Sequence, residues 1–371
     1  MPVPLLDVSR QHAALKDECV QVFAEVYDSG RYILGDEVEQ FESELARYTG
    51  TAEAVGMSSG SDALVAALMA LDVGPGDEVL CPVFSFFATA GAIVRLGATP
   101  VWVDVLPETF NIDLADAERK ITAQTKVIVP VHLFGQACDM ECVMALAEQH
   151  GLKVLEDAAQ AIGARFEDRP VGSMGTIGAF SFYPTKNLGA FGDAGAVVTQ
   201  DPALAERLRR LRNHGMHPRY HHHEVGGNFR IDALQAALLR IKFRHLDHYH
   251  AARRRNAAFY KSHLAGLPKL VIPVEKAASF HVWNQFTLRV VNGARDAFRS
   301  YLQEHGIGSE IYYPITLDQQ KCFQGLGKGG QTIHAAHELA KSVVSIPIFP
   351  ELAEAELEEV VAVIRRWHES A

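Results

Sequence analysis

Two short segments of the chain carry side chains that could act together on a covalently held cofactor. Residues 156–160 read EDAAQ and follow an apolar run, and residues 180–187 read FSFYPTKN and lead into a Gly-rich loop. A lysine amine such as that of Lys186 can form a Schiff base, and a carboxylate such as that of Asp157 can keep a ring nitrogen protonated. Taken alone, Asp157 could equally be a helix cap and Lys186 a solvated loop lysine.

Two further segments offer what a flat, phosphorylated ligand needs. Residues 58–64 read SSGSDAL and open a helical pattern, so backbone N–H groups around Gly60 and Ser61 could hold a phosphate dianion. Residues 82–89 read PVFSFFAT, where a ring such as that of Phe86 could stack on a planar cofactor. The alternatives are an ordinary serine N-cap and aromatic residues of the core. Together, the four segments describe a pyridoxal phosphate (PLP) site.

The elements that must position these segments alternate along the first two thirds of the chain. We predict strands at 78–81, 100–103, 127–130, 153–156 and 196–199, and helices at 89–97, 114–121 and 140–151. This alternation is typical of βαβ units and of a mostly parallel central sheet flanked by helices. Ligands of such sheets bind at the carboxyl ends of the strands, and Asp157 directly follows one of them.

The last third of the chain has a different pattern. Helical spacing from Ile231 to Leu264 predicts one long helix that bridges two domains. We expect a large PLP-binding domain over residues 1–245 and a small C-terminal α+β domain over residues 246–371. In the small domain we predict strands near 270–272 and 286–288, and helices near 297–305 and 354–367. A length of 371 residues is compatible with this division.

Composition excludes several classes of function. The formal net charge of −10 disfavours non-specific binding to nucleic acid or to an anionic membrane. The five cysteines are odd in number and scattered, so we expect no disulfide framework and a reducing, cytoplasmic compartment. The first residues lack the pattern of a secretory signal, and polar residues interrupt the most apolar window, 79–96, so we expect no membrane span.

Several separated motifs, in this order, resemble the sugar-nucleotide aminotransferases of the DegT/DnrJ/StrS type, which have the type I PLP-transferase fold. The resemblance spans nearly the whole chain. It is carried by YILG at 32–35, GSDAL at 60–64, EDAAQ at 156–160, SFYPTK at 181–186, GGNFRID at 226–232 and SIP at 345–347. It implies an enzyme of amino-sugar biosynthesis that transfers an amino group from L-glutamate to a keto sugar carried on a nucleotide diphosphate.

The resemblance also implies roles for residues around the cofactor. Lys186 would hold PLP covalently and then shuttle protons, and Asp157 would keep the pyridine nitrogen protonated. Phe86 would stack on the ring and Gln160 would hydrogen-bond the ring hydroxyl. The phosphate would be bound by Gly60, Ser61 and Ser181.

By the same resemblance, Asn228 would reach the phosphate of the neighbouring subunit, which implies a homodimer with shared active sites. Without the family, Asn228 is a polar turn residue. Arg230 matches a position that approaches the sugar, although it could instead pair with Asp232 at the start of the following helix. Tyr313 also matches the family at the substrate side.

A His-rich loop holds His214, His217, His221, His222 and His223. Its composition suggests metal, but no Cys or carboxylate pattern accompanies it and the family needs none, so we expect no metal site. The loop resembles one in members that aminate C3 of a keto sugar, so we expect His221 to face the substrate and favour a 3-keto hexose. Tyr312 stands where relatives that take uronic acid sugars have His, and Asp318 where many members have His, which argues against a uronate.

Four alternative functions compete with a 3-keto sugar aminotransferase. A 4-keto sugar aminotransferase and a non-catalytic PLP-binding regulator of the same fold both remain open. Sugar dehydratases of this fold replace the Schiff-base lysine with His, so the presence of Lys186 disfavours them. A nicotinamide dehydrogenase would need a Gly-x-Gly-x-x-Gly segment after the first strand, and the chain has none there.

Overall fold

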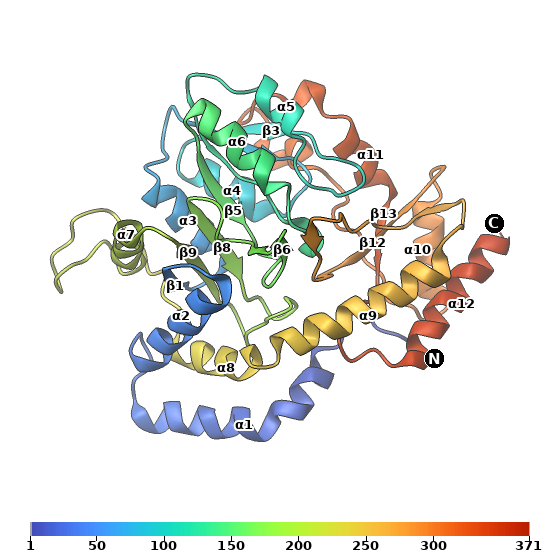
Figure 1. Cartoon of the computed structure of the whole chain (residues 1–371), viewed down its shortest axis with the longest axis horizontal. Coiled ribbons are helices and arrows are strands. Elements are labelled where there is room, and N and C mark those ends of the chain that lie inside the picture. The colour runs from blue at the N-terminus through green and yellow to red at the C-terminus, as the bar shows by residue number, and fades with distance from the viewer. Residues whose placement is uncertain (1, 371) are drawn as a thin grey trace.

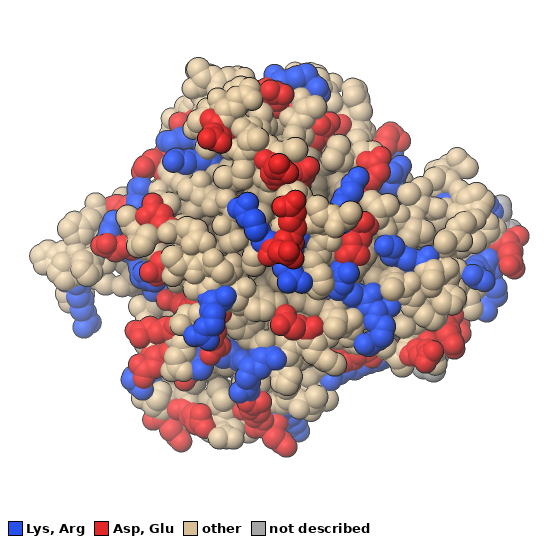
Figure 2. All heavy atoms as spheres, in the orientation of Figure 1, with Lys and Arg blue, Asp and Glu red and all other residues tan. Residues whose placement is uncertain are grey.

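The computed structural model describes residues 2–370, and the side chains of residues 2–369. A large α/β part surrounds one sheet, a smaller α+β part surrounds a second sheet, and helix α9 (Leu246–Leu264) runs between them (Figure 1). The predicted α/β class is thereby confirmed. On the face shown in Figure 2, acidic and basic side chains are interspersed and neither sign gathers into one large patch.

The central sheet has seven strands in the order β1-β9-β8-β5-β4-β2-β3. Their bounds are β1 (Glu53–Met57), β2 (Glu78–Pro82), β3 (Thr99–Val103), β4 (Thr125–Ile128), β5 (Lys153–Asp157), β8 (Ile177–Ser181) and β9 (Gly195–Thr199). Strand β9 is antiparallel to both of its neighbours, and the other pairs are parallel. The predicted mostly parallel sheet is confirmed, and six strands end at one edge.

Helices cover both faces of this sheet. They are α3 (Gly60–Ala70), α4 (Phe87–Arg95), α5 (Leu114–Arg119), α6 (Met140–His150) and α7 (Pro202–Arg212). Alternate residues of a strand face opposite sides, so Val79 and Cys81 lie in one buried cluster and Leu80 in another. Both faces are therefore core, which explains why the strands read as continuous apolar runs.

The predicted bridging helix is wrong as a single element. The structure has two helices, α8 (Ala233–Phe243) and α9, separated at Arg244 and His245. The amide of His245 donates to the carbonyl of Lys242 at 3.0 Å. This bond spans three residues instead of the four of an α-helix, and the chain changes direction there. No Pro or Gly marks the break, so periodicity alone could not locate it.

The smaller part has a three-stranded sheet, β10-β12-β13, in which both pairs are antiparallel. Its elements are β10 (Leu270–Val271), β12 (Phe286–Val290), α10 (Arg295–Glu304), β13 (Val343–Ile346) and α12 (Glu354–Ser370). Val3 packs in the same buried cluster and pairs with Ile307 in a parallel bridge. The division into domains at residue 245 remains a prediction.

The remaining elements connect these parts. A third small sheet joins β6 (Arg165–Phe166), β7 (Arg169–Pro170) and β11 (Ser279–Phe280). The described chain also has helix α11 (Ala335–Ser342) and four short 3-10 helices: η1 (Leu133–Gly135), η2 (Leu317–Gln319), η3 (Lys321–Phe323) and η4 (Gly330–Thr332). None of the helices over residues 2–370 combines the length and apolar character needed to cross a membrane.

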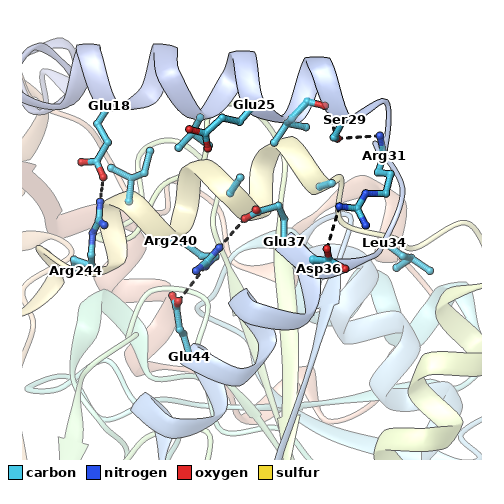
Figure 3. Close-up of a pocket in the computed structure, with 15 residues that line it drawn as sticks. Glu18, Glu25, Ser29, Arg31, Leu34, Asp36, Glu37, Glu44, Arg240 and Arg244 are labelled. Carbon is cyan, nitrogen blue, oxygen red and sulfur yellow. Dashed lines mark hydrogen bonds and ion pairs between the residues drawn. The ribbon is translucent and has the colours of Figure 1, made fainter.

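Helix α1 (Val8–Ser29) lies along α8, near α2 (Asp36–Thr49), and the three helices line a cavity of about 290 Å³ (Figure 3). Its arginines are all engaged, for Arg31 pairs with Asp36, Arg240 with two glutamates of α2, and Arg244 with a glutamate of α1. The cavity is therefore a polar interface between helices, in which carboxylates already neutralise the charges of the three arginines.

Candidate active site

Four loops meet at one edge of the central sheet, because four of its parallel strands end there. Ser58 to Ser61 follow β1, Phe86 follows β2, Asp157 ends β5 and Lys186 follows β8. The four sequence segments that suggested cofactor chemistry are thus brought together by the strand direction, as ligand sites of such sheets generally are.

Asp157 and Lys186 influence each other at the centre of this edge. Asp157 is 4% exposed, and burial raises the pKa of its carboxyl, while Thr89, the amide of Ala159 and the charge of Lys186 act in the opposite direction. Burial lowers the pKa of Lys186 to about 8, and the attraction of Asp157 limits the fall. Among the described residues the Lys186 ammonium has no hydrogen-bond partner. A lysine of this kind is partly deprotonated near neutral pH and can act as a nucleophile.

The start of α3 has the free backbone donors that could bind an anion, and Ser58 to Ser61 are called the anion-binding turn below. The side chain of Ser59 caps the helix by accepting the amide of Asp62 at 3.0 Å. The amides of Gly60 and Ser61 have no acceptor among the described residues, and they lie where the helix dipole favours an anion. A Cβ on Gly60 would lie 2.6 Å from the Cβ of Ser181, so only glycine lets these two segments approach. The donors fit a phosphate group.

Backbone contacts require glycine at Gly189, in the Lys186 loop, and at Gly195, the first residue of β9. A Cβ on Gly189 would lie 2.4 Å from the carbonyl oxygen of Pro184, and a Cβ on Gly195 would lie 2.4 Å from the carbonyl carbon of Ser59. These glycines let the lysine loop fold tightly and let β9 approach the anion-binding turn.

Gln160 and Tyr313 form a polar wall beside this centre. The Gln160 side chain accepts the amide of Phe134 at 2.7 Å and donates to the Tyr313 hydroxyl at 3.2 Å, so both ends of the amide are fixed. Burial raises the pKa of Tyr313 well above its ordinary value, and the tyrosine stays neutral. Phe86 is 56% exposed, and its ring centroid lies 6.3 Å from that of Tyr313, which leaves the ring accessible to a flat ligand.

The segment with Asn228 and Arg230 lies beside the anion-binding turn of its own chain. The carbonyl of Phe229 accepts the amide of Ser58 at 2.8 Å, and Arg230 donates to Asn213 at 2.7 Å. The Asn228 side chain is exposed and unbonded within the described chain. The structure therefore leaves the Asn228 amide available to a partner, and its action across a dimer remains a prediction.

His221 is placed apart from these groups. It is exposed in the loop after α7, at the left edge of Figure 1, and its backbone bonds to His217 and Pro218 within that loop. Over residues 2–370 no hydrogen bond or ion pair joins His221 to Lys186 or Asp157. Its role toward a substrate remains a prediction, and no three His, Cys, Asp or Glu side chains of the described residues are grouped as a metal site.

Sequence reasoning left the role of Glu156 open, and the structure shows what it contacts. Its carboxylate, fully buried, accepts the amides of Gly172, Met174 and Gly175 at 2.5–2.8 Å and the Nε2 of His132 at 3.0 Å. Burial opposes ionisation, but these donors hold the pKa of Glu156 below its ordinary value. Glu156 thus anchors the loop over residues 172–175. Of these two adjacent residues, only Asp157 places its carboxylate at the candidate site.

Thr89 was also missed by sequence reasoning. Its hydroxyl donates to Asp157 Oδ2 at 2.8 Å. The one available signal was the spacing Phe86 to Thr89, which places both residues on one turn at the start of α4. Nothing local distinguishes a threonine that meets a distant carboxylate from any other buried threonine.

Comparison with known proteins places the whole chain among aminotransferases. The sequence pattern of the DegT/DnrJ/EryC1/StrS aminotransferase family matches residues 13–365. The chain is similar to the "Pleiotropic regulatory protein" of Geobacillus stearothermophilus, with 47% identity over 99% of each chain. It is equally similar, at 47% identity over 98% of this chain and 97% of the relative, to a UDP-N-acetyl-3-dehydro-alpha-D-glucosamine 3-aminotransferase from Acidithiobacillus ferrooxidans.

Solved structures agree with the fold described here. The structure of Streptomyces venezuelae DesV, solved in complex with a ketimine intermediate, has a TM-score of 0.96 and 44% identity over 99% of both chains. The structure of NtdA from Bacillus subtilis, with bound cofactor PMP, has a TM-score of 0.92 and 31% identity over 99% of this chain and 85% of that one. Both similarities cover the central sheet and the smaller part together.

Proposed function

The chain belongs to the DegT/DnrJ/EryC1/StrS aminotransferase family, and from this premise we propose that it is a PLP-dependent enzyme that transfers an amino group to a nucleotide-linked keto sugar. We take L-glutamate as the donor and a 3-keto hexose as the acceptor. The observation that carries the proposal is the meeting of Lys186, Asp157 and the free amides of Gly60 and Ser61 at one edge of the sheet.

The residues present fit PLP in charge and shape. When bound, this cofactor supplies an aldehyde that takes up amino groups and a ring that accepts electrons from the reacting carbon. The amides of Gly60 and Ser61, with the Ser181 hydroxyl, would hold its phosphate. Phe86 would cover one face of the ring, and Asp157 would hold a proton on its nitrogen.

Lys186 would act twice. Its amine, with a pKa near 8, is neutral in part of the molecules at physiological pH and can bond to the cofactor carbon. Once released, Nζ could take a proton from the reacting substrate carbon and deliver it to the cofactor carbon on the other side of the shared nitrogen, because a base works best when its pKa is near the working pH. Asp157 favours the protonated amine and so supports the step in which Lys186 holds the proton.

The acceptor is proposed from the relatives. The Acidithiobacillus relative is named for amino transfer at position 3 of a UDP-linked sugar, and the His-rich loop of this chain resembles that of members acting at C3. Amino-sugar biosynthesis is therefore the proposed pathway class, and a 4-keto sugar is the alternative. The five cysteines, all free in the structure, support a reducing compartment, and we propose the cytoplasm.

The deciding experiment combines spectroscopy with product analysis. We expect the purified protein to show a cofactor absorbance band that Lys186→Ala abolishes, and the band to change on addition of glutamate. A panel of keto-sugar nucleotides is then added, and the products are identified by mass. Amination of 3-keto sugars supports the proposal, whereas turnover of 4-keto sugars alone would replace the proposed acceptor.

A non-catalytic regulator of the same fold is the second candidate, favoured by the name of the Geobacillus relative. The same experiment separates the two candidates. A regulator would retain the cofactor band but would not convert it on addition of glutamate, and no sugar in the panel would gain an amino group.

We further propose a homodimer in which Asn228 completes the phosphate site of the partner. Its exposed, unbonded amide supports this assignment. Loss of that amide should weaken cofactor retention by about 1–3 kcal/mol, the usual cost of removing a donor from a charged acceptor. Mixed dimers of Lys186→Ala and Asn228→Ala would hold one intact and one doubly defective site, so activity should return. Absence of recovery despite proven subunit exchange would show that Asn228 serves the site of its own chain or no site at all.

A further inference from the structure

The carboxylate of Asp157 has two partners that hold it in place before any ligand binds. Oδ2 accepts the hydroxyl of Thr89 at 2.8 Å, and Oδ1 accepts the amide of Ala159 at 3.2 Å. Asp157 is 4% exposed and Thr89 is 2% exposed, so water does not compete for these bonds. The orientation of the carboxylate is therefore set by the protein.

The direction of the hydrogen bonds follows from proton counting. An ionised carboxylate only accepts, so the single hydroxyl proton of Thr89 must go to Asp157. The Thr89 oxygen lies 3.1 Å from the Ser85 hydroxyl, and in that pair Ser85 must then be the donor. Ser85, which is 3% exposed, thus fixes the orientation of the Thr89 hydroxyl, and Thr89 in turn fixes the orientation of the Asp157 carboxylate.

The start of α4 adds to this arrangement. Thr89 lies in the first turn of the helix, three residues after Phe86, and the positive end of the helix dipole favours a carboxylate nearby. One turn therefore presents a ring from Phe86 and a hydroxyl from Thr89 toward the same site. A change in that turn would disturb both contacts.

We propose that Thr89, supported by Ser85, is a positioning residue that keeps the Asp157 carboxylate ionised and oriented to accept the pyridine N–H of the cofactor. This inference rests on the proposed function. Its physical reason is the burial of Asp157, which favours the neutral acid, because charge is costly away from water. A neutral Asp157 could no longer hold the pyridine nitrogen protonated.

The test removes the hydroxyl and keeps the shape. Thr89→Val is nearly isosteric, Thr89→Ser restores the hydroxyl, and Thr49→Val serves as the matched control. Thr49 is also a buried helical threonine, with its hydroxyl on the carbonyl of Leu45 at 2.9 Å, outside the site. Each protein is loaded with PLP labelled with nitrogen-15 in the ring, and the ring nitrogen signal is followed as a function of pH.

We expect the ring nitrogen to be protonated in the wild type, in Thr89→Ser and in Thr49→Val, and to lose its proton in Thr89→Val. The rate of cofactor conversion by glutamate should fall roughly ten- to hundredfold in Thr89→Val, as expected for loss of a hydrogen bond to a charged group, with little change in KM. Thr89→Ser should stay within about twofold of the wild type.

Ser85→Ala is the second variant, for the case in which Thr89→Val does not fold. It should shift the ring nitrogen signal in the same direction but less, since Thr89 keeps its proton. Identical nitrogen signals and rates in Thr89→Val and Thr49→Val, or an unshifted signal in Ser85→Ala where that variant alone is measurable, would overturn the inference. A wild-type protein that neither binds PLP nor reacts with glutamate would instead overturn the proposed function.

Discussion

Replacing Lys242 with methionine should change how stability depends on pH, with little change near neutrality. Lys242 is fully buried on α8 and donates to the carbonyl of Gly189, in the loop that carries Lys186. Its ammonium lies 5.6 Å from the Phe191 ring, and Cys19 and Glu351 are the nearby groups whose charges favour the cation. Methionine keeps the volume and removes both the charge and the donor.

The magnitude follows from two opposing effects. Burial lowers the pKa of Lys242 from its ordinary 10.5 to about 8, so the folded protein releases this proton before the unfolded chain does. Between pH 8 and 10.5 the unfolded state binds more protons, and stability therefore rises with pH by about 3 kcal/mol in all. Below pH 8 the folded protein therefore bears the full cost of burying the charged ammonium of Lys242. The lost hydrogen bond to Gly189 costs about 1–3 kcal/mol at any pH, since a neutral amine still donates.

At pH 7 the two effects nearly cancel in Lys242→Met, and at pH 10 the variant should be the less stable protein. Free energies of unfolding are measured by urea titration between pH 7 and 10 for the wild type and for Lys242→Met. Lys16→Met, at an exposed position of α1, is the control and should follow the wild type. If the difference in unfolding free energy between the wild type and Lys242→Met stayed the same from pH 7 to 10, the reasoning would be refuted.

Three further predictions address other parts of the structure. Burial lowers the pKa of His250 to about 3, so the wild type should lose about 1.4 kcal/mol of stability per pH unit as pH falls from 6.5 toward 3. His250→Leu should lose less, which acid titrations followed by circular dichroism can measure. Gly60→Ala should lose PLP on dialysis, because its Cβ would meet Ser181, whereas Gly74→Ala, with open space around it, should retain the cofactor; equal retention would contradict the close approach. Glu156→Gln should lower the unfolding free energy by about 2–4 kcal/mol yet leave the cofactor absorbance band in place, and loss of the band in a folded variant would assign it a direct role.

The position of the site could be predicted from sequence because it depends on strand direction. The segments that follow β2 and β5 were predicted to lie at the carboxyl edge, and they do. Strand β1 was not predicted, although Ser58 to Ser61 extend from its end. Its residues, EAVGM, form a short run with a glycine, and only pairing with β9 makes them a strand.

Other features depend on contacts between distant parts of the chain. The bond from Thr89 to Asp157 joins residues 68 positions apart, and the pattern around Thr89 is that of any helix start. The break between α8 and α9 follows from where α8 must pack, since Lys242 and Arg244 bind the Lys186 loop and α1. Hydrophobic periodicity continues across such a break, and it therefore predicted one helix.

The pairing of Val3 with Ile307 has a consequence for synthesis on the ribosome. Val3 must wait for a partner about 300 residues further along the chain, which at cellular elongation rates takes roughly 15–60 s. During that interval the segment around Val3 cannot reach its final place, however quickly the central sheet forms. We expect limited proteolysis of stalled nascent chains to cut this segment until residues beyond Ile307 have left the exit tunnel.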